Sequence, residues 1–145
     1  IEIIVHYAST VQMVLYEAVR NVASLDSSKD SVQIAINRIV QTGFYSSVND
    51  IPESITKTNK TTAIQAMQGY NKTLGAQLLS LFFLGSDSQL KQLKTDNPGL
   101  VKLIARLISL RGHGSVNPAI SEKEVKLLKN DLLDVIKAII GVFYE

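Results

Sequence analysis

Apolar residues that recur at three- and four-residue steps are the feature that most limits how this chain can fold. The clearest case ends the sequence, where Ser121-x-x-Glu124 is a capping box and Ile120 with Val125 supplies the flanking hydrophobic staple. Behind this start, the apolar stripe consists of Val125, Leu128, Leu132, Val135, Ile136, Ile139 and Phe143. Since an α-helix repeats every 3.6 residues, the stripe forms one face of a long final helix.

The start of the chain carries the same pattern. Its apolar positions are Ile4, Tyr7, Ala8, Val11, Val14, Leu15, Ala18, Val19 and Val22, which predict a long amphipathic helix over residues 2–24. A second helix is predicted from Val32 to Val40, with Gly43 at the position of a left-handed C-terminal cap.

The middle of the chain gives weaker signals. Periodicity fails from Phe44 to Asn59, which predicts a loop that includes a short turn of helix. The run from Ile64 to Phe82 predicts a helix that ends at Gly85, and Gly69 and Gly75 inside it indicate a bend or a close helix crossing.

Two further helices are predicted, one after Ser86 and one after Asn97, and no segment alternates as a strand. We therefore predict an all-α fold in which residues 1–145 form a single domain. Its architecture would be an up-and-down-like bundle of four to six helices with long N-terminal and C-terminal helices.

Composition excludes several classes of protein. No run of about 18 apolar residues is present, so a membrane span is not expected. There is no cysteine and there are only two histidines, so we expect no disulfide, no metal centre and no cofactor. A cytoplasmic location is predicted. Secretion is the alternative, because the first residue is Ile1 and the sequons Asn59-Lys-Thr61 and Asn71-Lys-Thr73 are present.

Chemically active residues are concentrated between the last two predicted helices. Between Asn97 and Ser121 the cations are Lys102, Arg106 and Arg111, and no acidic residue is present. Lys102 and Ser109 stand four residues before and three residues after Arg106, so the three side chains neighbour one another on a helix. This pattern favours an anionic partner, and a solvated helix face is the alternative.

The same region resembles the HEPN superfamily. The resemblance is carried by Leu110-Arg111, His113-Gly114 and Ile120-Ser-Glu-Lys-Glu124, and it covers the last third of the chain. Arg106 has the family's spacing from His113, but Leu107 follows it where a polar residue is usual. Arg111 has the family's local context, but it stands only two positions before His113. Which arginine would pair with His113 stays open.

The resemblance implies metal-independent cleavage of RNA, as in toxins and abortive-infection effectors. His113 would transfer a proton near neutral pH, and Arg106 or Arg111 would stabilise negative charge on the phosphate. Lys102 and Ser109 would contribute to substrate binding. In this family the site is commonly completed across a homodimer.

Other readings of these residues are open. Arg111-Gly-His-Gly114 also makes a competent helix terminus, with a basic residue near the last carbonyls and a glycine that closes the cap. The chain would then be a non-catalytic helical module that binds a protein partner. A secreted or structural helical protein, or a carrier of an apolar ligand, is the third possibility.

Overall fold

The chain folds into helices in all of the parts that the computed structural model describes, residues 2–22, 31–112 and 121–144. The predicted all-α fold is therefore confirmed. In chain order, the described elements are α1 (Glu2–Val22), α2 (Ser31–Thr42), the 3-10 turn η1 (Val48–Asp50), α3 (Glu53–Thr56), α4 (Lys60–Met67), α5 (Leu74–Leu84), α6 (Asp87–Asp96), α7 (Leu100–Gly112) and α8 (Glu122–Phe143).

The described part contains eight α-helices, more than the predicted four to six. That number did not count the short turn of helix expected in residues 44–59, and one predicted helix is two. The predicted loop over residues 44–59 contains η1 and the short helix α3. The run predicted as one helix up to Gly85 is two helices, α4 and α5.

Gly69 is the reason for the second division. Its φ of +88° lies in the left-handed region, which side chains other than glycine rarely adopt. The last carbonyls of α4, those of Ala66 and Met67, accept hydrogen bonds from the Arg20 guanidinium of α1, at 2.8 Å for Ala66. Gly69 therefore ends a helix, whereas the sequence pattern placed it inside one.

The predicted helix ends are found at the start of α8 and at the end of α2. Ser121 caps α8, since its Oγ accepts a hydrogen bond from the Glu124 backbone N–H at 3.1 Å. Gly43 follows α2 with a φ of +95°, as expected of a left-handed cap.

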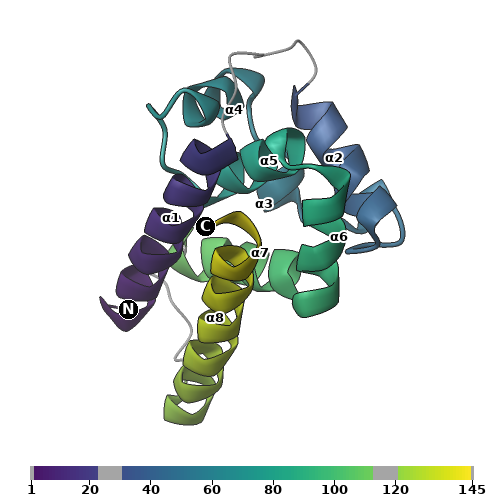
Figure 1. The fold of residues 1–145 in the computed structure, drawn as a ribbon. Helices are drawn as coiled ribbons and strands as arrows, with labels where there is room; N and C mark the ends of the chain where they lie inside the picture. The colour runs from purple at the N-terminus through teal and green to yellow at the C-terminus, as the bar shows by residue number, and fades with distance from the viewer. Residues whose placement is uncertain (1, 23–30, 113–120, 145) are drawn as a thin grey trace.

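Helix α5 lies at the centre of the bundle (Figure 1). Nine of its eleven residues are buried, including the polar Gln77 and Ser80. It packs against α1, α2 and α4, and more lightly against α3 and α7. Since α5 is apolar nearly all round, the other helices can cover it from several sides.

Helices α1 and α8 run side by side (Figure 1). The end of α8 is tied to α1 by two hydrogen bonds, from Asn21 Nδ2 to the Phe143 carbonyl at 2.9 Å and from Tyr144 Oη to the Val14 carbonyl at 2.8 Å. The first half of α8 extends beyond the rest of the bundle, and only Leu128 is buried among residues 122–131.

None of the helices in the described part of the chain is both long enough and apolar enough to cross a membrane.

Candidate functional site

Helix α7 carries the predicted substrate-binding side chains on one face. Lys102, Arg106 and Ser109 line the same depression, which has a volume of about 550 Å³ and is named here the Lys102–Ser109 groove. The other residues that line it are Tyr45, Pro52, Ser54, Ala105 and Ile108. The four-plus-three spacing seen in the sequence thus places these three residues together, because a helix returns to the same face after about seven residues.

Arg106 has a partner inside the protein. One of its guanidinium nitrogens lies 3.8 Å from Glu124 Oε2 in the first turn of α8. The other carboxylate oxygen, Glu124 Oε1, accepts a hydrogen bond from Ser121 Oγ at 3.1 Å. Both charged side chains are about half exposed, at 48% and 53%, so water screens their attraction and the pair contributes at most about 1 kcal/mol to stability.

Tyr45 is an aromatic side chain of the groove that the sequence did not indicate. It lies between α2 and η1, in the stretch predicted as a loop, and nothing in its neighbours marks it as functional. The Lys102 ammonium lies 5.8 Å from the centre of its ring, within range of a cation–π interaction. Partial burial raises the pKa of the Tyr45 phenol, so it stays a neutral hydrogen-bonding group at physiological pH.

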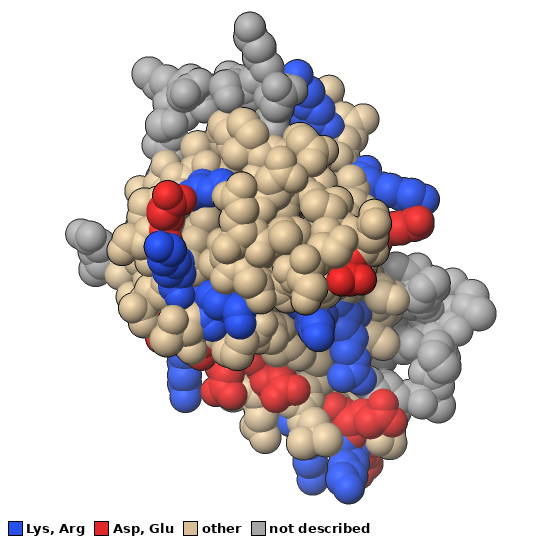
Figure 2. All heavy atoms as spheres, turned by 90° about the vertical axis from the view of Figure 1, so that its right-hand side faces the viewer, with Lys and Arg blue, Asp and Glu red and all other residues tan. Residues whose placement is uncertain are grey.

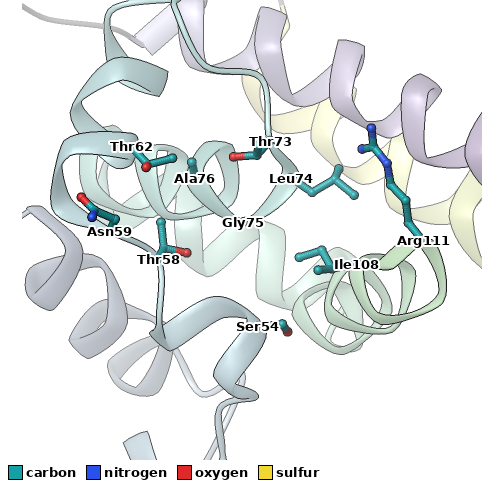
Figure 3. Close-up of a pocket in the computed structure, with 10 residues that line it drawn as sticks. All are labelled: Ser54, Thr58, Asn59, Thr62, Thr73, Leu74, Gly75, Ala76, Ile108 and Arg111. Carbon is teal, nitrogen blue, oxygen red and sulfur yellow. The ribbon is translucent and has the colours of Figure 1, made fainter. Parts of the chain in front are cut away.

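Arg111 lines a second depression, which has a volume of about 480 Å³ (Figure 3). We name it the Thr58–Arg111 pocket. Its other lining residues are Ser54, Asn59, Thr62, Thr73, Leu74, Gly75, Ala76 and Ile108. Ser54 and Ile108 line both depressions, so the two adjoin.

Among the described residues, Arg106 and Arg111 line two different depressions. Five residues turn an α-helix by about 140°, so two arginines at this spacing face different directions. Both are exposed at the surface of α7. His113 and Gly114, on which the catalytic prediction depends, lie outside the described residues, as does Ile120 of the predicted staple.

The surface charge is mixed on the side where α2 and α6 lie in Figure 1. Figure 2 shows that face, with lysine and arginine side chains interspersed with aspartate and glutamate around a largely uncharged centre. The net charge of +2 is therefore not gathered into one basic patch on that side. Across residues 2–22, 31–112 and 121–144, no three histidine, aspartate or glutamate side chains are grouped so that they could hold a metal ion.

Comparison with known proteins finds no relative: no protein-family model, no curated protein and no solved structure matches the chain.

Proposed function

We propose that this protein binds RNA along α7 and cleaves it without a metal ion, as a HEPN-like endoribonuclease of the toxin or abortive-infection type. The observation that supports this most directly is the Lys102–Ser109 groove, in which two cations and a hydroxyl that were predicted from spacing line one open depression. Phosphate groups are recognised by this combination of side chains.

The chemistry needs few protein groups, because RNA supplies its own nucleophile. The ribose 2′-oxygen forms a bond to the adjacent phosphorus while the bond from phosphorus to the 5′-oxygen breaks. The products are a 2′,3′-cyclic phosphate and a free 5′-hydroxyl. His113 would take the proton of the 2′-hydroxyl or give one to the leaving 5′-oxygen.

The arginines would bind the phosphate oxygens that carry the developing charge. A guanidinium can contact two oxygens at once, which suits the reacting phosphate. Arg106 reaches the groove from the same face as Lys102, and its contact with Glu124 is loose enough for a phosphate to compete. Arg111 faces the adjoining pocket, so it would bind a neighbouring phosphate or replace Arg106 in the reaction.

The first prediction is that the intact protein cleaves single-stranded RNA in the presence of EDTA and that His113→Ala does not. Removal of a general acid–base group is expected to slow cleavage by about 10²- to 10⁴-fold. End-labelled RNA resolved on a gel measures the rate, and phosphatase sensitivity of the ends identifies the cyclic phosphate. Arg106→Ala and Arg111→Ala, measured in parallel, identify the arginine that acts on the reacting phosphate.

Lys91→Ala is a suitable control, because Lys91 is exposed on α6 and does not line either depression. It should cleave like the unchanged protein. Equal cleavage by the unchanged protein and His113→Ala, or cleavage by neither over a range of salt and pH, would contradict the catalytic proposal.

A second candidate, binding to another protein chain, is favoured by the surface between α1 and α8. A narrow groove of about 140 Å³ there is lined by His6, Tyr7, Thr10, Val11, Lys129, Leu132, Leu133 and Ile136. Met13 and Ile140 continue the same helix faces, and both are exposed, Met13 at 68% and Ile140 at 41%. We propose that a second copy of the chain covers this face, which would place two α7 surfaces in one assembly.

A further inference from the structure

The Thr58–Arg111 pocket is lined by polar side chains that have no role in the proposed cleavage of RNA. It is lined by four hydroxyl side chains (Ser54, Thr58, Thr62 and Thr73) and by the Asn59 carboxamide, beside the apolar Leu74, Ala76 and Ile108. No carboxylate lines it. Its volume, about 480 Å³, is within the range of small-ligand sites, about 300–1,000 Å³. A sugar matches this lining, because its hydroxyls both donate and accept hydrogen bonds and its ring packs on apolar side chains.

Most of these hydroxyls are available to a ligand. Those of Ser54, Thr58 and Thr62 form no hydrogen bond with another described residue, whereas the Thr42 and Ser80 hydroxyls donate to carbonyls four residues earlier, at 2.6 and 2.7 Å. In Figure 3 the Thr58 and Thr73 oxygens point into the space around Gly75 and Ala76, and Arg111 stands at the far end beyond Leu74 and Ile108.

Gly75 lets the backbone of Ser54 and the side chain of Thr58 approach α5 closely. It occupies a helical position, where alanine is the better helix former. A Cβ built on Gly75 would lie 3.3 Å from Thr58 Oγ1, 3.4 Å from the Ser54 carbonyl oxygen and 3.9 Å from Ile108 Cδ1. A methyl group at this position would therefore press on the Thr58 hydroxyl and the Ser54 backbone.

The Thr58–Arg111 pocket adjoins the groove that we propose binds RNA. It shares Ser54 and Ile108 with the Lys102–Ser109 groove, so the two depressions adjoin and one strand can run through both. We infer that the Thr58–Arg111 pocket receives a ribose of this strand and that the Thr58 hydroxyl contacts its 2′-hydroxyl. The protein would then prefer single-stranded RNA to DNA of the same sequence, since the 2′-hydroxyl distinguishes the two. This inference rests on the proposed binding of RNA along α7.

The test is a binding measurement in which cleavage is prevented. Full-length His113→Ala protein serves as the parent, and fluorescence anisotropy gives its affinity for a labelled single-stranded RNA and for the DNA of the same sequence. Adding Thr58→Val removes one hydroxyl while preserving the shape of the side chain, and it should lower the ratio of RNA to DNA affinity roughly two- to tenfold. Gly75→Ala should lower the same ratio, because the added methyl group would displace the Thr58 hydroxyl.

Thr61→Val is the matched control, since Thr61 is one residue from Thr62 but does not line the pocket. It should leave the ratio unchanged. Equal affinity of the parent for RNA and DNA, or a ratio that neither Thr58→Val nor Gly75→Ala changes while Arg106→Ala still weakens binding to both strands, overturns the ribose site alone. If neither strand binds in a salt-dependent way, the RNA-binding proposal itself fails, and the ribose site fails with it.

Discussion

Arg106 is a residue for which two roles compete. Its guanidinium faces the groove that we propose for RNA, and it also lies 3.8 Å from the Glu124 carboxylate. Glu124 is held in turn by Ser121 at the start of α8, so its position is set by the helix cap. A carboxylate beside the cation weakens the attraction of that cation for phosphate, and it also disfavours unrelated anions.

The second prediction follows from this pair. Glu124→Gln should strengthen the binding of single-stranded RNA by up to about fivefold, because an exposed ion pair is worth at most about 1 kcal/mol and its loss frees the Arg106 guanidinium. Glutamine is also favoured at this position of a helix start, so the helix content measured by circular dichroism should not change. Glu122→Gln is the control: it removes the same charge from the same turn, and the Glu122 carboxylate forms no ion pair with another described residue. An equal gain in both variants would show a general charge effect and remove the special role of Arg106.

At the scale of elements, the break between α4 and α5 decides what faces the candidate site. Because α4 ends before Gly69, α5 begins anew at Leu74 and places Leu74, Gly75 and Ala76 along the Thr58–Arg111 pocket. A single helix through Gly69 would continue past this point and would not form the same lining. The left-handed backbone at Gly69 is therefore a requirement of the pocket as well as of the fold.

The third prediction compares two glycines. Gly69→Ala should lower the free energy of unfolding by about 1–2 kcal/mol, since a side chain in the left-handed region is strained, and its Cβ would lie 3.1 Å from an Arg20 guanidinium nitrogen. Gly141→Ala should raise it by up to about 1 kcal/mol, because Gly141 is within α8 and a Cβ there meets nothing within 4 Å. Urea denaturation measures both. A Gly69→Ala protein as stable as the unchanged one would show that the chain does not need this conformation.

At the scale of the whole molecule, apolar side chains on α1 and α8 stay exposed to solvent in a single copy of the chain. Leu133 and Ile140 of α8 are exposed at 44% and 41%, and Met13 of α1 at 68%. Two helices packed side by side with a shared apolar face can complete a four-helix arrangement with a second copy.

The fourth prediction is that the protein is a dimer in solution and that Leu133→Asp makes it a monomer, because a buried unpaired carboxylate in an apolar interface is costly. Light scattering coupled to size-exclusion chromatography measures the mass. Leu127→Asp is the control, since Leu127 is more exposed than Leu133, at 55%, but does not line the α1–α8 groove. A monomeric unchanged protein, or the same mass change in both variants, would contradict a homodimer through this face.

Much of the fold could be predicted because its signals are local. Ser121 caps α8 by accepting a hydrogen bond from the N–H of Glu124, three residues later, and Gly43 ends α2 through its own backbone conformation. The Lys102, Arg106 and Ser109 face is likewise fixed by the repeat of one helix. These features depend on neighbours within about one or two turns, so the sequence by itself determined the class of the fold, the two long helices and the cationic face of α7.

Only the tertiary structure decided what lies opposite that face. Tyr45 and Thr58 are far from α7 in the chain, and they reach its grooves because the buried side chains of α5 gather the other helices around it. Apolar packing is not directional, and its partners cannot be derived from the spacing within one helix. For the same reason, the contact of Arg106 with Glu124, the break at Gly69 and the adjoining Thr58–Arg111 pocket were decided by how the helices pack together.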